Sequence, residues 1–147
     1  MTSLSGRVRL LLFLLLTLSL IGLTTELLLL GHTEGNWQKV PIGMLATGAV
    51  TLVLLAVHRS RVTLGLFRFA MLACVVGGAL GIYHHFVGNA EFEREMVPEI
   101  AGWELWKETL TGATPVLAPA AIAQTGLIGL IAAIGLGGTG RRRQMSR

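Results

Sequence analysis

The sequence predicts an all-α integral membrane protein, a four-helix bundle with a short amphipathic helix in its second outer loop. Of its 147 residues, 52% are hydrophobic and only 14% are charged, and the mean hydropathy is +0.68. Apolar runs of roughly 20 residues, the length that crosses a bilayer, occupy residues 8–30, 40–57, 62–87 and 113–138. Because these runs and their short connections take up nearly the whole chain, we expect residues 1–147 to form a single transmembrane domain.

The charged residues predict how the spans are oriented. In a four-span bundle, nine arginines fall at three places on one side: Arg7 and Arg9; Arg59, Arg61 and Arg68; and Arg141, Arg142, Arg143 and Arg147. All eight acidic residues belong to the opposite side or to the outer half of a span. By the positive-inside rule the arginine-rich side is cytoplasmic, which places both termini there. The basic charge therefore indicates membrane orientation, and we expect no nucleic-acid partner.

The ends of the spans carry their own signals. The first run is too long for a signal-peptide core and has no small-residue cleavage site after it, so we expect a retained helix. Pro41 lies in the first turn of the second span, where a missing N–H costs least. Arg68 lies a short way inside the third span and can reach back to the cytoplasmic surface. Pro115 and Pro119 lie in the opening turns of the fourth span.

The second outer connection has the pattern of an amphipathic helix at residues 99–110. Ile100, Trp103, Trp106 and Leu110 recur every three or four positions, with charged residues between them. Tryptophan is enriched at the membrane–water interface, so we expect Trp37, Trp103 and Trp106 to be interfacial anchors. The helix should lie flat on the outer surface or cap the bundle.

Small residues at four-residue spacing predict where the helices pack. Membrane helices associate closely through such stripes. The third span has one stripe and the fourth has another, and their members are Ala73, Gly77 and Gly81, and Ala121, Thr125 and Gly129. The spacing leaves open whether the contacts are within one chain or between chains.

Histidines and carboxylates gather toward the outer ends of the first and third spans. The candidate metal ligands are Glu26, His32, Glu34, His85, Glu91 and Glu95, with Gln38 and Asn89 as polar support. Imidazole and carboxylate are the ligand types of zinc, manganese or iron. Two of the histidines, His32 and His85, are also candidate axial ligands for a haem. As a third interpretation, Glu26 and His85 form a buried hydrogen-bonded pair, which fixes helix register or relays protons.

No sequence motif indicates a catalytic site. Gln124 lies near the middle of the fourth span, where polar residues usually hydrogen-bond across helices. Cys74, the single cysteine, is expected to be a small packing residue. The sequence therefore favours a protein that is not an enzyme.

Three segments carry a family resemblance: TTELLLLGHTEGNWQKVP at residues 24–41, YHHFVGNAEFEREMVP at 83–98, and LTGATPVLAPAAIAQTGLIGL at 110–130. They resemble small, uncharacterised bacterial four-span inner-membrane proteins. The resemblance implies the four-helix fold and a bacterial inner membrane. It implies no activity and no catalytic residues.

These observations favour a small accessory subunit that packs against membrane partners or against copies of itself. One alternative is a redox or sensor protein that binds a divalent metal or haem through the outer cluster. Another is a proton or ion pathway through Glu26.

Overall fold

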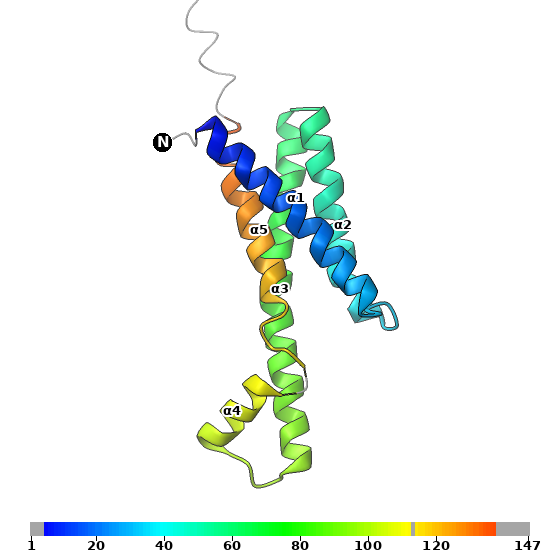
Figure 1. Ribbon diagram of the computed structural model, residues 1–147, viewed down its shortest axis with the longest axis vertical. Helices are drawn as coiled ribbons and strands as arrows, with labels where there is room; N and C mark the ends of the chain where they lie inside the picture. The colour runs from blue at the N-terminus through cyan, green and yellow to red at the C-terminus, as the bar shows by residue number, and fades with distance from the viewer. Residues whose placement is uncertain (1–4, 113, 138–147) are drawn as a thin grey trace, which may run out of the picture.

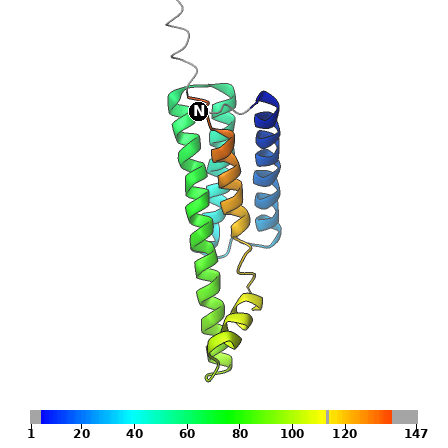
Figure 2. The ribbon, with the colours of Figure 1, turned by 90° about the vertical axis from the view of Figure 1, so that its left-hand side faces the viewer.

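The computed structural model describes residues 5–112 and 114–137, and every regular element in these ranges is an α-helix. Three helices are long and apolar enough to cross a membrane: α1 (Gly6–Leu29), α2 (Asn36–Val57) and α3 (Arg61–Met96). The other two, α4 (Gly102–Thr111) and α5 (Ala120–Ala132), are shorter. α3 packs against α2 and α5, and α1 lies on the far side of these two helices (Figures 1 and 2). The prediction of an all-α protein with long apolar helices is confirmed.

The buried face of α3 follows a spacing that alternates between three and four residues. Its members Leu64, Phe67, Met71, Cys74 and Gly78 are all buried. This alternation averages 3.5 residues, close to the helical repeat of about 3.6, so the residues stay on one side of the helix. They meet buried leucines of α1 and α2 in the core.

Glycines let α3 and α5 approach until their backbones touch. A Cβ atom placed on Gly78 would lie 2.6 Å from the Ala123 backbone nitrogen and 2.8 Å from the Pro119 carbonyl oxygen. From the other side, a Cβ on Gly126 would overlap the Met71 carbonyl oxygen. Such close approach through small residues is typical of helix pairs in membranes, where van der Waals packing drives association.

The predicted small-residue stripe on α3 divides between two neighbours. Gly77 faces Met44 of α2, whereas Gly81 faces Pro119 beside α5. Each four-residue step turns the position by about 40° around a helix of 3.6 residues per turn. A long stripe at strict four-residue spacing therefore winds from one face to another. On α5, Thr125 and Gly129 are buried and Ala121 is partly buried.

The fourth apolar run is not one continuous helix. The prediction was a span over residues 113–138, of which residues 113 and 138 lie outside the described ranges; the helix covers only Ala120–Ala132, with turns at 116–119 and 133–137. Pro115 and Pro119 lack an N–H and restrict the residues before them, so the helix begins only after the second proline. At the other end Gly135 has φ +78, a left-handed conformation that ends helices.

Two arginines cover the carbonyl end of α5. Arg68 of α3 donates from Nη2 to the Ala133 carbonyl at 2.9 Å, and Arg9 of α1 donates from Nη2 to the Ile134 carbonyl at 2.9 Å. Cations are stabilising at this end because the helix dipole is negative there. Arg68 therefore reaches toward the end of the bundle where α3 begins, in the direction that its sequence position predicts.

α3 continues past the predicted end at residue 87 as far as Met96. Its 36 residues span about 54 Å at 1.5 Å per residue, which exceeds a hydrocarbon core of about 30 Å. α4 folds back against this extension (Figure 1). The amphipathic helix predicted at residues 99–110 thus exists as Gly102–Thr111, but it packs on the end of α3 instead of covering the bundle.

Asn89 ties this extension to the chain between α4 and α5. The side chain is 2% exposed. Its Nδ2 donates to the carbonyls of Thr109 at 2.9 Å and Thr114 at 2.8 Å, and its Oδ1 accepts from the Thr114 N–H at 3.2 Å. One amide therefore satisfies three backbone groups, one in the last turn of α4 and two at Thr114 in the connection that follows.

Candidate functional site: a polar groove between α1 and α5

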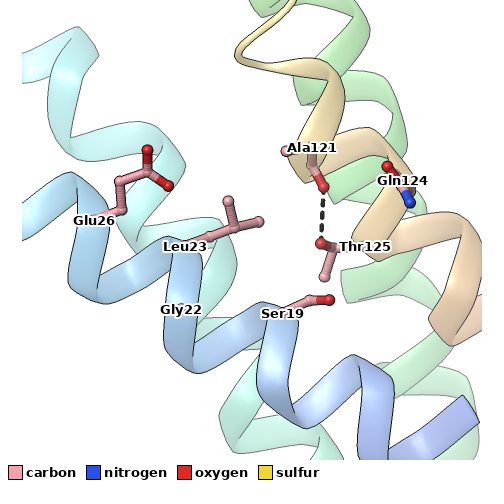
Figure 3. A pocket seen from close by; sticks show the side chains of 7 residues that line it. All are labelled: Ser19, Gly22, Leu23, Glu26, Ala121, Gln124 and Thr125. Atoms are coloured by element: carbon pink, nitrogen blue, oxygen red, sulfur yellow. Dashed lines mark hydrogen bonds between the residues drawn. The ribbon is translucent and has the colours of Figure 1, made fainter.

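A groove of about 360 Å³ lies between α1 and α5. α1 lines one side and α5 the other (Figure 3). Four of the lining side chains are polar, although both helices are mostly apolar; the lining residues are Ser19, Gly22, Leu23, Glu26, Ala121, Gln124 and Thr125. The groove is therefore the place where polar groups of two apolar helices face a common space.

The polar side chains of the groove differ in whether they have a hydrogen-bond or ionic partner. The Thr125 hydroxyl donates to the Ala121 carbonyl at 2.8 Å within its own helix. Glu26 and Gln124 are exposed. In the described part of the chain, the one ion pair joins Lys107 to Glu108, so Glu26 has no cation beside it there. A carboxylate at this depth is expensive in lipid unless it finds a hydrogen-bond donor or a charged partner.

The crossing of α1 over α5 keeps the groove open. Where α1 begins the two helices lie close together, and toward the loop after Leu29 they separate (Figure 1). Glu26 is therefore exposed, and not buried as the predicted pair with His85 would require, because the helices diverge at the level of its side chain (Figure 3).

The expected pairing of Glu26 with His85 is not formed. His85 lies 3.0 Å through Nδ1 from the Pro115 carbonyl oxygen. Because a carbonyl only accepts, Nδ1 carries the proton in this contact. His85 thus fixes the chain before α5 to α3. The ring of the neighbouring His84 lies 6.2 Å from that of Trp37 at the start of α2.

The predicted metal ligands are spread over separate elements. Glu26 lies in the groove, His32 and Glu34 in the turn after α1, and Glu91 and Glu95 are exposed on the extension of α3. Across residues 5–112 and 114–137, no group of three or more His, Cys, Asp or Glu side chains lies close enough to hold a metal ion. The two candidate haem ligands also differ in setting, since His32 lies in the turn and His85 contacts Pro115. A cofactor in this cluster stays a prediction.

Two tryptophans contact α3 at nearly the same position along its length. Trp37 lies beside His84, and the ring of Trp106 from α4 lies 4.9 Å from that of Phe86. His84 and Phe86 are two residues apart, or about 3 Å along the helix. Trp37 and Trp106 therefore contact α3 at nearly the same level; their role as anchors at a membrane boundary stays a prediction. Trp103 is 79% exposed on α4.

Comparisons with protein-family models, curated proteins and solved structures find no significant match. A function for this chain is therefore inferred from its own geometry. Reasoning from sequence singled out Glu26 and Gln124 separately but did not place them in one groove, and it missed Ser19. The available signal was a polar residue within each apolar run, at Ser19 and at Gln124.

Proposed function

We propose that this chain is a four-span protein of a bacterial inner membrane, with both termini in the cytoplasm. In this proposal it is a non-enzymatic accessory subunit, and its groove between α1 and α5 binds a membrane helix of another protein. The observation that carries the proposal is the exposed carboxylate of Glu26 in a lateral groove, with no cation beside it among the described residues. A partner helix with a hydrogen-bond donor would remove the cost of that carboxylate in lipid.

The satisfied backbone at both ends of α5 supports a fourth span. The helix itself, with 13 residues, is only about 20 Å long. Irregular backbone at membrane depth is tolerated where protein groups satisfy it. His85 contacts the Pro115 carbonyl before α5, and Arg68 and Arg9 bond the Ala133 and Ile134 carbonyls after it. The turns flanking α5 can therefore complete the crossing.

Labelling of single cysteines tests the orientation. In a Cys74→Ser background, we expect Thr33→Cys to react with a membrane-impermeant maleimide applied to the outside of intact cells. His58→Cys, between α2 and α3, should react only after the membrane is permeabilised. Both positions are exposed in the protein, so membrane sidedness should decide the outcome. The reverse pattern would overturn the proposed orientation, and labelling of both sites from outside would contradict a span through α2.

The charge of the groove favours a partner other than a second copy. A twofold contact brings the same patch of two copies together, so it would place two Glu26 carboxylates near each other. Among the described residues, no cation lines the groove. A different protein with an asparagine, lysine or arginine at this depth matches Glu26 better.

Site-specific crosslinking tests the groove as the docking site. A photo-crosslinking amino acid in place of Leu23 should capture one partner in the native membrane at a fixed stoichiometry. The same group in place of Ile21, about 200° away around α1, should not. Glu26→Leu should lower the yield about tenfold or more, because removing one partner of a buried charged hydrogen bond costs about 2–5 kcal/mol.

Glu34→Gln is the matched control, because Glu34 is exposed in the turn after α1 and outside the groove. It should leave the yield unchanged. Equal yields from the Leu23 and Ile21 positions, or no effect of Glu26→Leu, would overturn this assignment of the groove.

A further inference from the structure

A second pocket, also of about 360 Å³, lies where α1 begins, α2 ends and α5 ends. It is lined by Arg9 of α1, by the end of α2, the start of α3 and the connection between them, and by the turns after α5; its residues are Arg9, Leu55, Arg59, Ser60, Arg61, Leu64, Gly135, Leu136 and Gly137. Nothing in the proposed role of the α1–α5 groove uses this pocket.

The pocket is cationic without a carboxylate to balance it. Three of its lining residues are arginines and none is acidic. Within the part of the chain that the structure describes, the one ion pair is Lys107 with Glu108, so none of these arginines is paired there. Glu26 lies 17 positions from Arg9 on the same helix, which is about 25 Å away. At that distance salt screens most of the attraction.

Arg9 is held in place but keeps unused donors. Its Nη2 donates to the Ile134 carbonyl at 2.9 Å, which fixes the guanidinium against the end of α5. Its Nε is buried and has no hydrogen-bond partner among the described residues. An unmet donor of a charged group is costly in a buried position. An anion that enters the pocket and takes up the remaining guanidinium donors would be stabilised.

We propose that this pocket binds a phosphate group. A phosphate oxygen pair matches the planar fork of a guanidinium, and arginine favours such bidentate contacts. Three arginines can donate together to the several oxygens of one phosphate group, which has more acceptor atoms than a carboxylate. Arg61 is the first residue of α3, whose positive dipole end adds to the attraction. The phosphate can belong to an anionic lipid headgroup or to a soluble phosphate ester, since both reach a pocket at the membrane surface.

Binding by the purified full chain tests this assignment. Protein stripped of lipid in a maltoside detergent is titrated with inorganic pyrophosphate, and separately placed in nanodiscs of phosphatidylcholine with or without phosphatidylglycerol. Thermal unfolding and native mass spectrometry report binding. We expect stabilisation by at least one ligand, and an apparent affinity about tenfold lower when Arg59→Gln and Arg61→Gln are combined, since each charge-assisted bond contributes substantially.

Two further variants make the test decisive. Arg7→Gln removes a charge about 200° around α1 from Arg9 and should bind as the native protein does. The double variant Arg59→Lys and Arg61→Lys keeps the positive charges that orient the membrane helices. It should still weaken phosphate binding, because lysine lacks the paired N–H donors of the guanidinium group.

If phosphatidylglycerol stabilises the protein and pyrophosphate does not, the ligand of the pocket is a lipid headgroup. If pyrophosphate stabilises the protein, the ligand is a soluble phosphate. The proposal fails if neither ligand binds, if Arg7→Gln weakens binding as much as the glutamine pair, or if the lysine pair binds as tightly as the native protein.

Discussion

Gly78→Ala is expected to force α5 away from α3 and to lower the free energy of unfolding by about 3 kcal/mol, the upper part of the range for overpacking. The added methyl group would lie 2.6 Å from the Ala123 backbone nitrogen and 2.8 Å from the Pro119 carbonyl oxygen. Backbone atoms cannot turn aside as the end of a flexible side chain can, so the two helices must separate. Unfolding in mixed micelles of detergent and SDS measures the change.

Gly65→Ala is the matched control on the same helix. A Cβ at Gly65 meets nothing within 4 Å, and alanine is a better helix former than glycine by up to about 1 kcal/mol. This variant should be unchanged or slightly more stable. If Gly78→Ala and Gly65→Ala unfold alike, the close backbone contact between α3 and α5 is contradicted.

Asn89→Ala is expected to free the end of α4 and the connection after it from α3. It removes three hydrogen bonds to the backbone of Thr109 and Thr114, in a position that is 2% exposed. Leaving buried backbone groups unpaired costs about 1–3 kcal/mol each, and water that enters will recover part of this. We expect a loss of about 3 kcal/mol, with much faster hydrogen exchange at the Thr114 amide.

Asn36→Ala controls for the loss of an asparagine, because Asn36 is an exposed first residue of α2. Its hydrogen exchange and unfolding should match those of the native protein. Asn89→Asp adds a sharper test, since it keeps an acceptor for the Thr114 N–H but turns a carboxylate oxygen toward two carbonyls. It should destabilise at least as much as alanine, and native-like exchange at Thr114 in either variant would refute the role of Asn89.

The long apolar runs predicted the all-α fold, because length and hydrophobicity identify membrane helices directly. They did not predict where helices end. α3 runs past residue 87 to Met96 because no proline interrupts these residues and because Asn89 finds partners in α4 and in the connection after it. α5 is shorter than its apolar run because two prolines and the glycine at position 135 end it on either side.

The groove was less predictable than the helices. Periodicity shows which residues share a face of one helix, but it does not show which helix lies opposite. Glu26 and Gln124 belong to runs nearly 100 positions apart, and only the crossing of α1 over α5 brings them to one space. The outer His and Glu residues were predicted to form one cluster because their spans end at the same level. Residues at equal depth on different helices do not necessarily contact one another.

The support of α5 by other helices has a consequence for biogenesis. α5 is synthesised after α1 and α3, and the carbonyls beyond its two ends are met by His85, Arg68 and Arg9 of those helices. Released alone from the insertion machinery into lipid, the segment would expose these carbonyls to hydrocarbon at a cost of several kcal/mol each. If α5 is the fourth span proposed above, its insertion is coupled to docking on α1 and α3, so its folding and its membrane integration are one step.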